Sequence, residues 1–256
     1  MKLRVLGCSG GQLPGHRLSS FLVDDTLLID AGGVTGALSW QAQLKIQNIL
    51  VTHIHLDHVM GLGTLADNLF GKCKASINIW GTRPIVEGLR KYFFNDGIWP
   101  DFTKIKGPSQ TKPVLQLRVL PIKRATRVGN YRITPVAVHH IVPSVAFFIQ
   151  NQTKTLLHLG DTGPTSEVWS LAKKQNSLGG VVIETSFPNR LRDVAAASRH
   201  LTPAMLAREI DKLNRPATPI YVTHLKPQFR REIIAEIKAL RRPQLHVLKD
   251  DEVLRF

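Results

Sequence analysis

The sequence THIHLDH, residues 52–58, places three imidazoles and one carboxylate within seven positions. It follows the apolar segment IQNILV, which predicts a β-strand. If that strand continues, His53 and His55 point to the same side of it. Asp57 and His58 then fall in the turn that leads into a helix. Because imidazole and carboxylate groups are typical ligands of zinc, manganese and iron(II), the heptad predicts a metal site.

The composition indicates a globular chain with a strong positive charge. Hydrophobic residues make up 43% of the 256 residues, and the 34 Lys and Arg outnumber the 19 Asp and Glu, giving a net charge of +15. Such a charge attracts phosphates, on nucleic acid or on a small nucleotide. Much of it lies in amphipathic segments such as FRREIIAEIKALRRP, residues 229–243, which predicts a helix with a solvated basic face. Cys8 and Cys73 form no CxxC pair and are too few for a disulfide framework.

The sequence shows no sign of a membrane protein. No apolar run approaches the roughly 20 residues needed to span a bilayer. The N-terminal MKLRVLGCSGG predicts a first strand and has too short an apolar stretch for a signal peptide. We therefore expect a cytoplasmic protein without a membrane partner.

Short apolar strands alternate with helical patterns, which predicts one α/β domain over residues 1–256. Strands are expected over 2–7, 20–24, 27–30, 48–52, 76–80, 115–120, 131–138, 145–150, 154–159, 180–184, 219–223 and 244–248. Helices are expected over 35–44, 58–69, 83–93, 165–175, 203–213 and 228–240. The segment 94–113 lacks a regular pattern, so it is expected to be a loop that serves as a lid, a pocket wall, a subunit contact or a packed surface segment.

A centre with two metals needs further ligands from distant strands. His139 and His140 are adjacent on a predicted strand, and because neighbours point to opposite faces, at most one of them can reach the metals. Asp161, in LLHLGDTGP, and His224, in IYVTHLKP, each end an apolar strand. Strand ends that meet loops are where α/β folds usually build their sites.

A second pair of residues has a different signature. His200 precedes Thr202 and Pro203, which predict the N-cap and first residue of a helix. Glu184 ends another apolar strand and could orient that imidazole beside the metals. The alternative for His200 is an exposed histidine in a capping loop. The remaining histidines, His16, His158 and His246, are expected to be structural or exposed.

The combined motifs resemble the metallo-β-lactamase superfamily, through HIHLDH, the GD that contains Asp161 and the strand-end His224. Within that superfamily, four stretches resemble the class II cyclic-nucleotide phosphodiesterases. They are HIHLDHVMGL, FFNDGIWPDFT, IETSFPNR followed by RHLTP, and THLKP. The resemblance implies an α/β fold, a four-layer αββα sandwich that binds two metals between its sheets.

The resemblance also implies how the ligands divide between two divalent ions. One ion would be held by His53, His55 and His140, and the other by Asp57, His58 and His224, with Asp161 bridging them. His140 is preferred to His139 because HIVPSVAF resembles the corresponding family segment. Zinc is the expected metal, with manganese or iron(II) as alternatives. A homodimer is implied by the resemblance alone.

The expected chemistry is phosphodiester hydrolysis. Water shared by two divalent metals loses a proton near neutral pH and attacks phosphorus as hydroxide. We expect His200 to act as the general acid, with Glu184 orienting it; Asp57 is counted with them as catalytic. By resemblance the substrate is 3′,5′-cyclic AMP, or cyclic GMP, opened to the 5′-monophosphate. The candidate substrate contacts are Lys226, Phe187, Asn189 and Trp99.

Two alternatives remain open. A tRNA 3′-processing endonuclease of the same superfamily shares the seven-ligand pattern and the Glu/His pair, and a charge of +15 suits tRNA. The chain lacks the long Gly/Pro- and Lys-rich insertion with which that family clamps tRNA, and only in this alternative is nucleic acid a partner. The second alternative is a non-catalytic, metal-stabilised nucleotide-binding protein.

Overall fold

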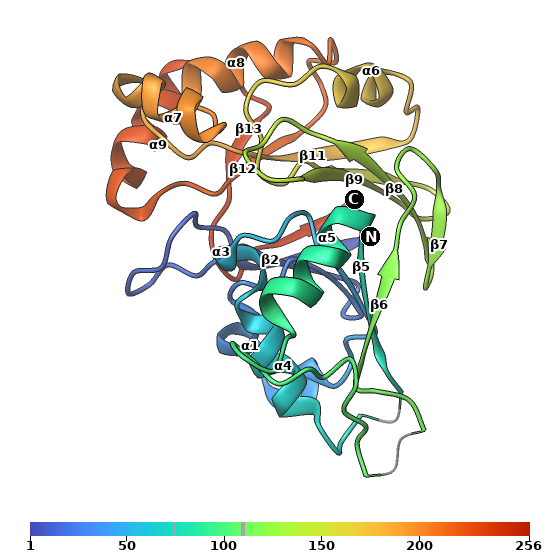
Figure 1. The fold of residues 1–256 in the computed structure, drawn as a ribbon. Helices are drawn as coiled ribbons and strands as arrows, with labels where there is room; N and C mark the ends of the chain where they lie inside the picture. Colours follow the sequence, from blue (N-terminus) through green and yellow to red (C-terminus); the bar gives the residue numbers. More distant parts are fainter. Residues whose placement is uncertain (74, 109–110) are drawn as a thin grey trace.

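The computed structural model describes residues 1–73, 75–108 and 111–256 as two seven-stranded sheets lying face to face, with helices on their outer faces. Figure 1 shows α6 (Glu167–Lys173), α7 (Arg192–Ser198), α8 (Pro203–Asp211) and α9 (Arg230–Ala239) over one sheet, and α1 (Val34–Ala37) and α4 (Gly61–Leu69) beneath the other. This is the expected α/β four-layer arrangement, which the structure confirms. Within the described residues, no helix has the length and apolar character required to cross a membrane.

The first sheet has the strand order β14-β1-β2-β3-β4-β5-β6. The β2–β3 hairpin turns at Asp24 and Asp25, whose φ angles of 42° and 61° suit a tight turn that follows the twist of the strands. From β3 to β6 the pairing is parallel. The bounds are β1 (Lys2–Gly7), β2 (Ser20–Val23), β3 (Leu27–Ile29), β4 (Asn48–Leu50), β5 (Ile77–Gly81), β6 (Leu115–Val119) and β14 (Val253–Arg255).

The second sheet has the order β13-β12-β11-β10-β9-β8-β7. Strands β10 to β13 are parallel, whereas β7 to β10 are joined in antiparallel pairs. The bounds are β7 (Thr126–Val128), β8 (Tyr131–Ala137), β9 (Val145–Gln150), β10 (Thr155–His158), β11 (Leu178–Glu184), β12 (Ile220–Thr223) and β13 (Leu245–Val247).

The helices mostly follow the predicted segments. Those associated with the first sheet are α1 (Val34–Ala37), α2 (Trp40–Gln43), α3 (Leu56–Val59), α4 (Gly61–Leu69) and α5 (Arg83–Gly88), which continues as a π-helical turn, Leu89–Phe93. Those over the second sheet are α6 (Glu167–Lys173), α7 (Arg192–Ser198), α8 (Pro203–Asp211) and α9 (Arg230–Ala239). Short 3₁₀ turns, Asn189–Leu191 and Pro227–Phe229, precede α7 and α9.

Two predicted helices are divided, and three short elements were not predicted. The segment 35–44 breaks at Ser39, whose side chain accepts a hydrogen bond from Ala42 N and caps α2. The segment 58–69 breaks because Gly61 N donates to Ala31 O outside the helix. Strands β7 and β14 have three residues each, too few to show a period, and α7 begins without a side-chain cap.

The segment 94–113 contains no helix or strand among its described residues; 109–110 lie outside the described part. Phe94 and Phe102 are buried in the main core, and Trp99 packs on α4, where Gly63 leaves room for the indole. These aromatic side chains anchor the loop to the protein, whereas Ile98 at its tip is 70% exposed.

Candidate metal centre

The predicted ligands converge in space although they come from four distant parts of the chain. Their donor atoms form two groups, each with all atoms within 4.8 Å of one another, and Asp161 belongs to both. The first group is His53, His55, His140 and Asp161, and the second is Asp57, His58, Asp161 and His224. They follow β4, β8, β10 and β12, or lie in α3. The structure thus brings all seven together, whereas the side chain of His139 is exposed.

Short distances define the cluster. Asp161 Oδ1 lies 3.4 Å from His58 Nε2, and Asp161 Oδ2 lies 3.3 Å from His224 Nε2 and 3.7 Å from His53 Nε2. His140 Nε2 is 3.2 Å from His55 Nδ1. Five imidazole nitrogens and two carboxylates therefore face a common space.

The hydrogen bonds around His53 direct an unpaired nitrogen into that space. Thr52 donates its hydroxyl proton to Asp30 and lies 3.1 Å from His53 Nδ1, so the His53 proton belongs on Nδ1, where it is donated to Thr52. The Nε2 atom is then an acceptor. It is buried and has no hydrogen-bond partner in the described part of the chain, which suits a cation ligand.

The same arrangement recurs at three other imidazoles. His58 Nδ1 lies 2.7 Å from the Asp30 carboxylate, and His140 Nδ1 lies 3.2 Å from the carbonyl of Arg199. His224 Nδ1 lies 3.0 Å from the hydroxyl of Ser186. Each outer nitrogen has a hydrogen-bond partner, which orients the ring so that its Nε2 atom is directed inward as the candidate ligand atom. The residues present thus fit a pair of metal ions.

Backbone strain accompanies this packing. His224 and Asp30 adopt φ angles of 64° and 54°, a region that residues other than glycine seldom occupy. Gly10, in the loop after β1, lies so close that a Cβ there would be 2.6 Å from His224 Nδ1. The glycine lets the loop pack directly on the imidazole.

The pKa values of the first group favour neutral imidazoles. Burial lowers the pKa of His53 well below its ordinary value and also lowers the pKa values of His55 and His140. Neutral imidazole is the form that binds a metal. These three side chains are therefore ready to act as ligands at neutral pH.

The carboxylates are held in their charged form. Burial opposes this, but the imidazoles of His224 and His58 keep the pKa of Asp161 well below its usual range. The pKa of Asp57 is also lowered against burial, by a hydrogen bond from His224. His58, buried but facing Asp161 and Asp30, has a pKa raised well above its ordinary value. An incoming cation would displace the proton of His58, as metal binding generally does.

Asp30 is the main functional residue that the sequence analysis missed. It is fully buried and accepts hydrogen bonds from Thr52 N, Thr52 Oγ1 and His58 Nδ1. It follows the apolar β3, so it shows the same signal, a carboxylate ending an apolar strand, that identified Asp161 and Glu184. Arg199 and Ser186 were also missed, and they carry no such signal because they act through a backbone carbonyl and a hydroxyl.

Replacing Asp30 with asparagine should weaken metal binding about 10- to 100-fold, the range typical of such outer partners. The amide retains an acceptor for Thr52 but turns a donor toward His58 Nδ1, which disturbs the proton that fixes the ring. Competition with a chelator followed by metal analysis measures this. Asp25→Asn, at the surface ion pair with Lys2, is the matched control. Equal metal affinity in the two variants would contradict the role of Asp30.

His200 and Glu184 form a pair beside the cluster. His200 Nδ1 lies 2.5 Å from Glu184 Oε1, and both residues are buried. The His200 ring lies between those of His140 and His224, with centroids 5.1 and 5.6 Å away. Burial disfavours the charged imidazole, but the Glu184 carboxylate outweighs it and raises the pKa of His200 to about 9. At neutral pH His200 therefore carries a proton that it can donate.

The candidate substrate contacts divide into two sets. Lys226 is close enough to His200 to affect its pKa, although its Nζ donates to the carbonyl of Gly10, and the Phe187 ring lies 5.8 Å from the His200 ring. Asn189 instead accepts a hydrogen bond from Ala204 N at the start of α8, and Trp99 packs on α4. The first set lies beside the candidate acid, and the second supports the surrounding structure.

The three histidines expected to be structural or exposed lie outside the two ligand groups. His158 ends β10 and is buried against Phe21, and burial lowers its pKa to about 4. His246 is exposed and lies 2.5 Å from Glu252. His16 is half-buried in the loop after β1.

Comparison with known proteins identifies the branch of the fold. A probable 3′,5′-cyclic-nucleotide phosphodiesterase of Yersinia pestis is 29% identical, with 88% of this chain and 78% of that protein covered. The structure matches unliganded yeast PDE1 with a TM-score of 0.83 at 19% identity, covering 100% and 99% of the two chains. It also matches the short form of human tRNase Z with a TM-score of 0.73 at 18% identity, covering 100% and 99%.

The two structural matches show the fold alone, because a cyclic-nucleotide phosphodiesterase and a tRNase share it. The family model described as cAMP phosphodiesterases class-II matches residues 33–240. That range contains all seven cluster residues as well as Glu184 and His200. The chain therefore belongs to the class II cAMP phosphodiesterase family.

Proposed function

We propose that the chain hydrolyses 3′,5′-cyclic AMP, and cyclic GMP as a related substrate, to the 5′-monophosphate. The observation that carries this proposal is the buried His200–Glu184 pair beside a cluster that suits two divalent ions. A metal cluster alone serves many hydrolases. A protonated imidazole beside it supplies what an alkoxide leaving group needs.

The seven clustered residues are proposed as the ligands of two divalent ions, with zinc the expected metal because histidine and carboxylate donors suit it. Two such ions polarise phosphoryl oxygens and lower the pKa of a coordinated water. His53, His55 and His140 would hold one ion, and Asp57, His58 and His224 the other, with Asp161 serving both. The side chain of Asp57 is 26% exposed, and we propose that substrate approaches the cluster from its side.

His200 is proposed to protonate the ribose 3′-oxygen as it leaves. Glu184 accepts from Nδ1, so the proton available for donation is on Nε2. Ser186 donates to Glu184 and also contacts His224 Nδ1 at 3.0 Å, which links the acid pair to the metal cluster. Lys226 and Phe187, next to His200, are proposed contacts for the phosphate and the base.

The pH profile offers a test of the acid. Because His200 must be protonated to act, activity should fall as the pH rises through its pKa. In Glu184→Gln, burial remains without the carboxylate that outweighs it, so the pKa falls and the alkaline limb moves to lower pH. Bound cations lower the pKa of His200 in both proteins. The measurement is therefore the comparison of their kcat profiles against pH, both at saturating metal. Coincident alkaline limbs would contradict the assignment of His200.

The function itself is tested by supplying the metal-loaded protein with cyclic AMP, cyclic GMP and a precursor tRNA. We expect 5′-AMP from cyclic AMP, identified by chromatography against 3′-AMP. Accurate 3′-end cleavage of the tRNA without cyclic-nucleotide turnover would favour the endonuclease alternative, which the tRNase Z fold and the net charge of +15 support. Tight cyclic-nucleotide binding without product would favour the non-catalytic alternative.

A further inference from the structure

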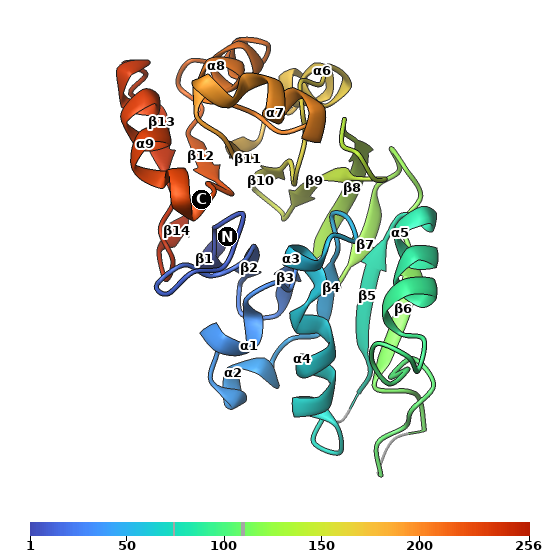
Figure 2. The same cartoon turned by 60° about the vertical axis from the view of Figure 1, so that its left-hand side comes forward.

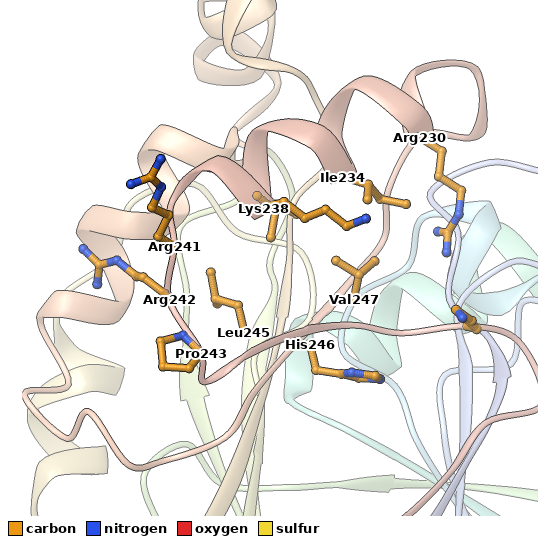
Figure 3. Close-up of a pocket in the computed structure, with 11 residues that line it drawn as sticks. Arg230, Ile234, Lys238, Arg241, Arg242, Pro243, Leu245, His246 and Val247 are labelled. Carbon is orange, nitrogen blue, oxygen red and sulfur yellow. The ribbon is translucent and has the colours of Figure 1, made fainter.

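A groove with no role in the metal centre lies between α9 and β13. Its volume is about 730 Å³. Figure 3 shows Ile234 and Val247 pointing toward each other across it, with the Lys238 side chain extending alongside. The apolar floor is completed by Ile237 and Leu245. Helix α9 and strand β13 lie at the outer edge of the molecule in Figure 2.

The rim of the groove is uniformly basic. Its lining residues include five Lys and Arg and no Asp or Glu: Arg230, Lys238, Arg241, Arg242 and Lys249. The acidic residues of α9 are engaged on its other side, where Glu232 pairs with Arg190 and Glu236 accepts from Asn189 N. The helix therefore directs its positive charge toward the groove.

Three of these cations are available to a ligand. Arg242 is held by Asp211 through two contacts, and Arg230 donates to the carbonyl of Leu248. Lys238, Arg241 and Lys249 are exposed and have no ion pair in residues 1–73, 75–108 and 111–256. Three unpaired cations over an apolar floor favour an anionic ligand that also carries apolar groups.

The backbone of β13 supplies a third feature. In the described part of the chain, β13 pairs with β12 and has no strand on its other edge. Ile220 N donates to Gln244 O, and Leu248 N donates to Val222 O, so the even-numbered residues face β12. The backbone groups of Leu245 and Val247 then face outward. Leu245 N already donates to Arg242 O, so the Leu245 carbonyl and both backbone groups of Val247 are the ones with which an extended peptide can pair.

We propose that this groove binds an extended acidic segment of a partner protein, which adds a strand beside β13. The main chain of the segment would pair with Leu245 and Val247, its aliphatic side chains would cover the apolar floor, and its carboxylates would meet Lys238, Arg241 and Lys249. A second copy of this chain is disfavoured because two such grooves repel each other. Single-stranded RNA lacks a stacking partner, since the ring of His246 is engaged with Tyr221 and Glu252.

The proposal is tested by selecting peptides from a random display library on the immobilised full-length protein and measuring affinities of synthetic copies by fluorescence anisotropy. We expect acidic peptides with aliphatic residues. Lys238→Glu/Arg241→Glu should weaken them about tenfold or more, equivalent to at least about 1.4 kcal/mol. The control Lys72→Glu/Arg124→Glu lowers the charge equally, from +15 to +11 (two reversals of two charges each), and should retain binding. Backbone N-methylation of the peptide should also abolish binding.

Four outcomes of the peptide experiment would overturn the proposal. They are failure to select any peptide, selection of peptides without acidic residues, equal loss of affinity in the two double variants, and binding that survives N-methylation. A poly(U) oligonucleotide that binds more tightly than the peptides and is released by Lys238→Glu/Arg241→Glu would assign the groove to RNA instead. Self-association abolished by that variant in sedimentation would assign it to a second copy. Cyclic AMP turnover by the variant should be unchanged, since the groove residues are separate from the metal cluster.

Discussion

Asp161→Asn should abolish cyclic-nucleotide hydrolysis and prevent the protein from retaining two metal ions. Asp161 is the residue shared by both ligand groups, and its two oxygens lie 3.3 to 3.7 Å from three imidazole nitrogens. Asparagine keeps the size but removes the negative charge and one of the two oxygen donors. We expect kcat/KM to fall by at least about 10³-fold, or about 4 kcal/mol of transition-state stabilisation.

The measurements are metal content per chain after dialysis and the rate of 5′-AMP formation. Asp193→Asn is the matched control, because the Asp193 side chain is 95% exposed and belongs to neither ligand group. Circular dichroism establishes that the variant is folded. A variant that keeps two metals and ordinary activity would contradict the bridging role.

His200→Gln should lower kcat for cyclic AMP by about 10² to 10⁴-fold, the usual contribution of a general acid. Its metal content should be unchanged, because His200 belongs to neither of the two proposed ligand groups. The ribose alkoxide is a strongly basic leaving group and needs a proton. The 4-nitrophenolate of bis(4-nitrophenyl) phosphate leaves as a stable anion, so this substrate should be affected much less.

The decisive quantity is therefore the loss of kcat for cyclic AMP divided by the loss of kcat for bis(4-nitrophenyl) phosphate. His139→Gln provides the control, since His139 is exposed although it neighbours a cluster residue. Equal losses on both substrates would mean that His200 supports the structure or binds the phosphate, without donating a proton to the leaving group. A reduced metal content would likewise count against the acid assignment.

The fold was predictable because most of its strands are short runs rich in apolar or β-branched residues that alternate with helical patterns. The positions of β1 to β6 along the chain and the later alternation of strands and helices follow from such runs. The breaks at Ser39 and Met60 were not predictable, since they depend on hydrogen bonds to residues outside the local pattern. Strands β7 and β14 exist because a neighbouring strand supplies their pairing.

The candidate site likewise combines residues that local sequence patterns predicted with contacts that only the folded chain supplies. THIHLDH indicated metal ligands because four donor groups occur within six positions. Local alternation could exclude one of His139 and His140, and the family resemblance, not the alternation, selected His140. In the structure that imidazole is positioned between His55 Nδ1 and the carbonyl of Arg199, a contact across 59 residues.

The sequence by itself determined the kinds of donor group, the strand ends that carry them and the family to which they belong. Only the tertiary structure decided which nitrogen of His58, His140 and His224 faces the cluster, because Asp30, Arg199 and Ser186 bind the opposite nitrogen of each ring from distant parts of the chain. It also decided that His200 is held protonated, since the Glu184 carboxylate reaches this imidazole and outweighs the effect of burial only when β11 and the loop before α8 are folded together. Side-chain chemistry is local, but proton positions and pKa values depend on neighbours that folding brings within about 3 Å, where hydrogen bonds form.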